Sequence, residues 1–190
     1  MEKIPFFPFN EAKATQVAAH LIKLAGGVFD HYLLAKCFYD LDREALKKWG
    51  QPIVGGTYRL FDFGPLIYEQ YQAASPGADT FFALHIRRVA NQLSVVRDPG
   101  DDDLSKAELI LAERVFARWR NRTFEQAHDQ ILSLPECGKN ELHGDRIPIE
   151  LILKKTGRTA AQIKALALEI RAEKHLKSAI ESASLASQTR

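Results

Sequence analysis

The chain has 190 residues, of which 46% are hydrophobic and 26% charged, and its formal net charge is +2. This length suits one domain, or one domain with an appendage, and the apolar fraction is enough to bury a core. This charge balance argues neither for nor against a nucleic-acid partner, since a dominant electrostatic attraction to DNA usually needs a stronger or more clustered basic excess. No apolar run approaches the roughly 18 residues of a membrane span, and no secretory signal is visible, so we expect a cytoplasmic protein without a disulfide.

The first nine residues form an apolar, extended arm, because the prolines in this segment prevent a helix. Three phenylalanines make the arm too apolar for a free tail, so we expect them to pack on the domain or on a partner. They are Phe6, Phe7 and Phe9.

Helical spacing of apolar residues, together with polar capping residues, predicts a mainly α fold, a compact domain of about six to seven helices. The expected helices are, in chain order, 10–25, 30–48, 66–72, 105–118, 123–134, 148–155 and 159–180. Ser105 and Glu108 form a capping-box pattern. In the second helix the charges fall mostly between the apolar positions; they are Asp40, Asp42, Arg43 and Glu44.

A small extended or hairpin element interrupts the helices. Residues 55–65 alternate as a short strand does, and Pro65 is suited to the first position of the helix that follows. Residues 80–97 fit a hairpin with its turn at Ala90-Asn91, and a helix from Thr80 to Ala90 is the competing interpretation. The acidic run at 98–103 lacks the ligand spacing of a calcium loop, so we expect no metal there.

These elements suggest four parts. The arm (1–9) precedes a helical domain (10–146). A C-terminal helix pair (147–182) is expected to pack on the same domain, and the Ser/Ala-rich residues 183–190 are expected to form a disordered tail.

Catalytic motifs are not recognisable in the sequence. The six histidines stand in none of the known nucleophile or metal signatures, and the glycine pairs do not form a phosphate loop. We therefore expect a protein that is not an enzyme and that carries no cofactor.

The C-terminal helix pair offers an alternative function. Its helix, short turn and second helix have the rhythm of a helix-turn-helix, in which the second helix enters the major groove of DNA. The basic residues that would contact phosphate are Lys154, Lys155, Arg158 and Lys164. A pair of packed helices with a solvated basic face explains the same pattern.

Two stretches of the chain carry a family pattern. The first is AKCFYDLD at 35–42 followed by TYRLFDFGPLIYEQY at 57–71, with Gly64-Pro65 as its most specific element. The second is the Leu104-Ser105 helix start followed by TFEQAH at 123–128. Together they span about residues 12 to 180, and they resemble the Panacea domain of SocA-like antitoxins, a phage-associated family.

The resemblance implies that the chain binds and neutralises a protein toxin encoded nearby, and it leaves open a homo-oligomer. Aromatic side chains anchor many protein interfaces, so the aromatic segment and the arm are the expected contact surfaces. Gly64 and Pro65 are expected to fix a turn. The candidate contact residues, several of which would also suit a core, are Phe6, Phe7, Phe9, Tyr58, Arg59, Phe61, Phe63, Tyr68 and Tyr71.

Overall fold

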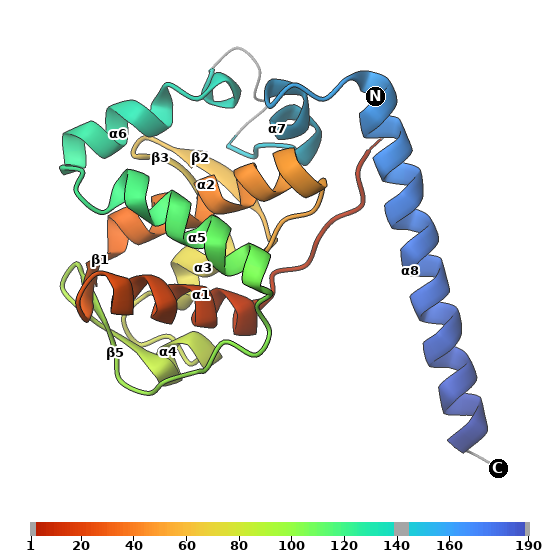
Figure 1. Cartoon of the computed structure of the whole chain (residues 1–190), viewed down its shortest axis with the longest axis horizontal. Coiled ribbons are helices and arrows are strands. Elements are labelled where there is room, and N and C mark those ends of the chain that lie inside the picture. Colours follow the sequence, from red (N-terminus) through yellow and green to blue (C-terminus); the bar gives the residue numbers. More distant parts are fainter. Residues whose placement is uncertain (1–2, 139–144, 189–190) are drawn as a thin grey trace.

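The computed structural model describes residues 3–138 and 145–188. Within these ranges a helical body carries one long helix along its side (Figure 1). The helices are α1 (Glu11–Leu24), α2 (His31–Trp49), α3 (Tyr68–Ala73), α4 (Phe81–His85), α5 (Lys106–Trp119), α6 (Phe124–Leu132), the 3-10 turn η1 (Pro135–Cys137), α7 (Ile149–Lys155) and α8 (Ala160–Gln188). The strands are β1 (Val28–Asp30), β2 (Tyr58–Phe61), β3 (Gly64–Ile67), β4 (Ile86–Val89) and β5 (Gln92–Val95).

The helix starts follow the expected capping chemistry. The side chains of Asn10 and Asp30 accept backbone N–H bonds at the starts of α1 and α2. Ser105 and Thr123 each form a complete capping box at α5 and α6. Each cap satisfies N–H groups that have no partner inside the helix. The mainly helical fold with a small β component is therefore confirmed, with eight α-helices in the described part instead of six to seven.

Three boundaries differ from expectation. Pro65 lies in β3 rather than at a helix start, because Gly64 and Pro65 return the chain antiparallel to β2, and α3 begins only at Tyr68. Of the expected 80–97 hairpin, the turn at Ala90-Asn91 is confirmed, but residues 81–85 are helical. The helix expected to end near Ile180 continues to Gln188, and residues 189–190 of the expected tail lie outside the described residues.

The strands form two small antiparallel sheets. One has the order β1-β5-β4, and the other is the β2–β3 hairpin. Gly64 has a φ of +99°, and a Cβ there would lie 2.6 Å from Ile131 Cγ2. The turn therefore requires glycine for its backbone conformation and for its close approach to α6.

Helix α2 lies at the centre of the fold and packs against α5, α6, α7, β1 and β3. Apolar residues such as Leu34, Phe38 and Leu41 are fully buried, as predicted. The acidic side chains of Asp40 and Asp42, which the sequence places between the apolar positions, are buried as well. A helix buried around most of its circumference leaves no solvated face for these charges, so each needs a partner inside the protein.

The Asp42 carboxylate binds the segment that leads into the β2–β3 hairpin. Oδ1 accepts hydrogen bonds from the backbone N–H groups of Ile53 and Val54, and Oδ2 accepts one from Gly55 N–H and one from the Tyr58 hydroxyl, all at 2.8–2.9 Å. Burial raises the pKa of Asp42 to about 6, and these four donors oppose that rise. Four donors converging on one side chain define how the hairpin approaches α2.

The N-terminal arm lies between the body and α8 (Figure 1). The backbone O of Phe7 accepts from Gly56 N–H, and Ile4 is buried in the core. On the other side, Arg171 and Lys174 of α8 donate to the carbonyls of Lys3 and Phe6 at 2.9 and 2.7 Å. The arm thus packs on its own domain, which is one of the two arrangements expected from the sequence; the other was packing on a partner.

We expect Asp42→Asn to lower the free energy of unfolding by about 2–4 kcal/mol, because the amide NH2 would face N–H donors that then lose their acceptor. Tyr58→Phe removes one of the four donors and should cost about 1 kcal/mol. Urea unfolding followed by circular dichroism measures both.

Asp62→Asn is the control, because this exposed side chain should change stability by no more than about 0.5 kcal/mol. Equal stability of the Asp42→Asn and Asp62→Asn proteins would contradict the role given to Asp42.

Candidate functional site

A cavity of 560 Å³ opens where the start of α2, the β2–β3 turn, α3, the β4–β5 hairpin and the start of α6 meet. We call it the aromatic cleft. This volume lies within the range of about 300–1,000 Å³ that is typical of ligand pockets. Its lining residues are Asp30, His31, Tyr32, Leu33, Phe63, Tyr71, Arg88, Asn91, Arg122 and Phe124.

Aromatic rings of the cleft contact one another in two groups. Tyr32 and Phe124 have ring centroids 4.5 Å apart, which joins α2 to the start of α6. Tyr71 of α3 contacts His31 at 4.9 Å and Phe63 at 5.9 Å. These rings come from four separate parts of the chain, so the cleft exists only in the folded protein.

His31 is a neutral side chain in this environment. It is 3% exposed, and burial, reinforced by the positive charge of Arg88, lowers its pKa to about 4. Nη1 of Arg88 lies 3.4 Å from His31 Nε2. Because a guanidinium only donates hydrogen bonds, Nε2 faces it as an acceptor and the ring proton is placed on Nδ1.

Lys36 lies behind the aromatic wall of the cleft. Its side chain is fully buried, and Nζ donates to the backbone O of Pro65 at 3.1 Å. Nζ also lies over the rings of Tyr32 and Phe63, at 4.7 and 5.3 Å from their centroids. Burial lowers the pKa of Lys36 to about 7. This lysine therefore holds β3 against α2 and is only partly protonated at neutral pH.

The expected contact residues lie in three different environments. Phe63 and Tyr71 line the cleft, and Phe61 stacks on Phe63 at 5.3 Å. Arg59 lies over the ring of Tyr68 and pairs with Asp145. In contrast, Tyr58 is buried and bonded to Asp42, so it belongs to the core, and Phe7 and Phe9 pack partly buried against that core.

The sequence alone did not indicate most of the residues that line the cleft. His31, Tyr32, Arg88, Arg122 and Phe124 lie outside the segments that were selected for their aromatic content. A strand register for β4 and β5 would have placed Arg88 beside the Ala90-Asn91 turn, but nothing local in the sequence shows that this turn meets α2. That contact is made by Asn91 O, which accepts from His31 N–H at 2.7 Å.

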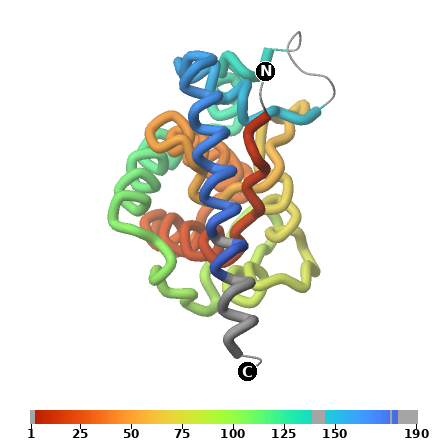
Figure 2. Tube along the Cα trace, turned by 90° about the vertical axis from the view of Figure 1, so that its right-hand side faces the viewer, coloured from red at the N-terminus to blue at the C-terminus, as the bar shows by residue number. Residues whose placement is uncertain are grey.

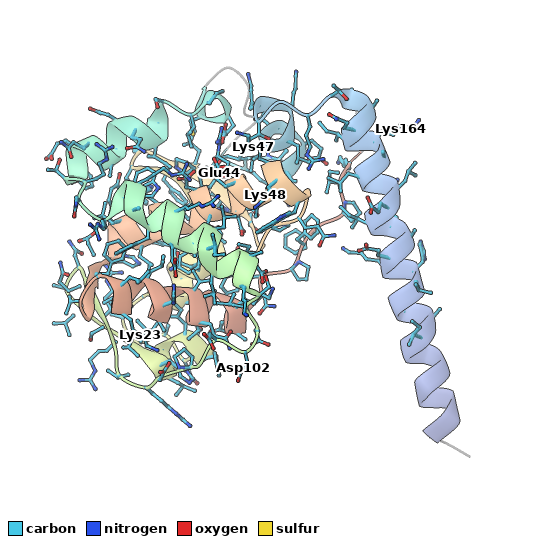
Figure 3. All side chains as sticks on the ribbon, viewed as in Figure 1. Lys23, Glu44, Lys47, Lys48, Asp102 and Lys164 are labelled. Carbon is cyan, nitrogen blue, oxygen red and sulfur yellow. The ribbon has the colours of Figure 1, made fainter. Side chains whose placement is uncertain are left out.

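The basic residues of the C-terminal pair are partly engaged within the chain. Arg158 donates to the backbone O of Lys47 at the end of α2. Lys154 is exposed, Lys155 is half-buried, and Lys164 lies exposed near the start of α8 (Figure 3). The contacts of Arg158 reduce the number of cations that the pair can present to a phosphate backbone.

No family model matches this chain, and no curated protein or solved structure matches it either. Among the described residues, no group of three or more metal-ligating side chains gathers to hold an ion. In residues 3–138 and 145–188, no helix combines the length and hydrophobicity that a bilayer span requires. Cys37 and Cys137 are both buried and free.

The lowered pKa of Lys36 predicts a pH-dependent stability. Between about pH 7 and 10.5 the buried amine is neutral while the unfolded chain keeps it protonated, so the unfolded state binds more protons and stability rises with pH. Lys36→Met removes this contribution and roughly preserves the volume. We expect the difference in unfolding free energy, variant minus wild type, to be constant below pH 7 and to fall between pH 7 and 9.

Denaturant titrations at pH 6, 7, 8 and 9 measure this difference. Lys47→Met, at an exposed position of the same helix (Figure 3), is the control and should show no such slope. A pH-independent difference for Lys36→Met would show that Lys36 is charged throughout in the folded protein. The constant part of the difference is not diagnostic, because the variant also loses the bond to Pro65.

Proposed function

We propose that this chain is an antitoxin-like protein that binds and neutralises a cognate protein toxin, with the outer face of α8 as its main contact surface. The observation that carries the proposal is the exposure of large apolar side chains along α8. Leu168 is 52% exposed, Leu176 63% and Ile180 59%. Apolar surface that gathers on one projecting element is typical of a protein-binding site.

The two faces of α8 differ. Ile163, Leu166, Ala167 and Ile170 are buried and attach the first turns of the helix to the body. The exposed residues 168, 172, 176 and 180 recur every four positions, so they form one stripe on another side of the helix. A helix with one attached face and one exposed apolar stripe can enter a hydrophobic groove of a partner.

The N-terminal arm extends this surface. Phe6 is 47% exposed, and its backbone O is bonded to Lys174 of α8. Arm and helix lie side by side (Figure 2). We therefore include Phe6 in the proposed contact surface, whereas Phe7 and Phe9 contribute mainly to the core.

The Panacea-like sequence pattern supports a toxin as the partner, and α8 and the arm support the mode of binding. The DNA-binding alternative has less support, because one of its four candidate cations, Arg158, donates to a backbone carbonyl of this chain, and so do Arg171 and Lys174 of α8. Protein binding is thus the function that the geometry favours.

Co-expression in a bacterial host tests the proposal. Each gene that flanks this one is induced alone and together with this chain, and we expect one neighbour to arrest growth only when expressed alone. Leu168→Asp combined with Leu176→Asp should abolish both the rescue and co-purification, since a charge in a hydrophobic groove is strongly unfavourable. Because both side chains are exposed, the variant should keep its fold.

Leu84→Asp is the matched control, since Leu84 is 61% exposed but lies on α4, away from α8 (Figure 1). It should rescue growth as well as the wild type. If no neighbour is toxic, the antitoxin role is wrong. If the double variant rescues as well as the wild type, the toxin binds elsewhere than α8.

A further inference from the structure

The aromatic cleft carries an excess of positive charge. Two guanidinium groups, those of Arg88 and Arg122, line it together with one carboxylate, that of Asp30. Oδ1 of Asp30 is already bonded to the backbone N–H groups of Tyr32 and Leu33. The cleft is therefore suited to an anionic ligand and not to a cationic one.

Both arginines are oriented by backbone contacts. Nε of Arg88 donates to Ala90 O at 2.8 Å, and Nε of Arg122 donates to Arg118 O at 3.2 Å. Ala90 has a φ of +52°, a conformation that residues other than glycine rarely adopt, and this turn places the carbonyl that holds Arg88. Nη1 and Nη2 of Arg88 also lie 3.4 Å from His31 Nε2 and from Asn91 Oδ1, so one N–H of each terminal nitrogen remains for a ligand. The planar guanidinium groups match a phosphate or a carboxylate.

The rest of the lining suits a flat ring with polar edges. Lys36 Nζ already lies over the rings of Tyr32 and Phe63, so Tyr71 and Phe124 are the rings of the lining that we assign to stacking. The carboxamide of Asn91 adds a polar group beside them: its Oδ1 accepts from Arg88 Nη2 at 3.4 Å, and its amide nitrogen is a donor. The aromatic walls and the polar groups at their edge match a nucleobase, and the two arginines match a phosphate. A nucleotide combines both, because its phosphate is attached to the base through a sugar.

We propose that the aromatic cleft is a nucleotide-binding site. The base stacks on Phe124 and Tyr71, and the phosphate binds Arg88 and Arg122. This site is separate from the apolar stripe of α8, so its test is independent of the proposed antitoxin role.

Isothermal titration calorimetry of the full chain with AMP, GMP, CMP and UMP tests the proposal, with the four corresponding nucleosides and inorganic phosphate as probes of the two halves. We expect at least one nucleotide to bind saturably with a stoichiometry of one. The matching nucleoside should bind at least about tenfold more weakly, because it lacks the charge-assisted bonds to arginine. Inorganic phosphate should also bind more weakly, because it cannot stack.

Variants locate the site. Arg88→Gln, Arg122→Gln and Phe124→Ala should each raise the dissociation constant about tenfold or more. Arg87→Gln and Phe81→Ala are the matched controls: Arg87 is the exposed neighbour of Arg88 on β4, Phe81 is an exposed aromatic on α4, and neither lines the cleft. Both should leave the dissociation constant unchanged.

Either of two results overturns the proposal. The first is that none of the four nucleotides binds. The second is that binding occurs but responds equally to the cleft variants and to the controls, or does not distinguish nucleotide from nucleoside.

Discussion

The buried polar side chains of α2 determine how the rest of the fold is arranged. Three of them and the half-buried Arg43 each bind a different element. Lys36 binds Pro65 in β3, Asp40 accepts from the Trp119 indole of α5 at 2.9 Å, Asp42 binds 53–55, and Arg43 pairs with Glu136 of η1 at 2.5 Å. An apolar α2 could pack against these elements in several registers, whereas a buried charge is tolerated only where its partner is in place. We interpret this set of contacts as the main source of structural specificity.

The aromatic cleft and the attachment of α8 lie at opposite ends of this helix. The aromatic cleft begins at His31 and Tyr32, the first residues of α2. The attachment of α8 involves its other end, where Arg158 binds Lys47 O and Leu166 packs beside Gly50. A helix of 19 residues is about 28 Å long. One rigid element thus separates the proposed nucleotide site from the proposed protein-binding surface and fixes both in relation to the same core.

Local patterns were sufficient for much of the fold. Capping residues and apolar spacing located α1, α2, α5 and α6, because these signals act within one or two turns. The sequence did not reveal the burial of Asp40 and Asp42, since their partners are 79 and 11 to 16 residues away in the chain. The same reason applies to the cleft: Phe63 and Tyr71 were recognised as aromatic candidates, but Arg88 and Arg122 reach the cavity only through tertiary packing.

Hydrogen exchange of single backbone amides measures whether Asp42 holds the segment before β2 on the central helix. We expect the amides of Ile53, Val54 and Gly55 to exchange as slowly as those in the middle of α2. In Asp42→Asn these three amides should exchange much faster relative to α2, as local opening no longer requires global unfolding. Fast exchange of the three amides in the wild-type protein would show that Asp42 does not hold this segment on α2.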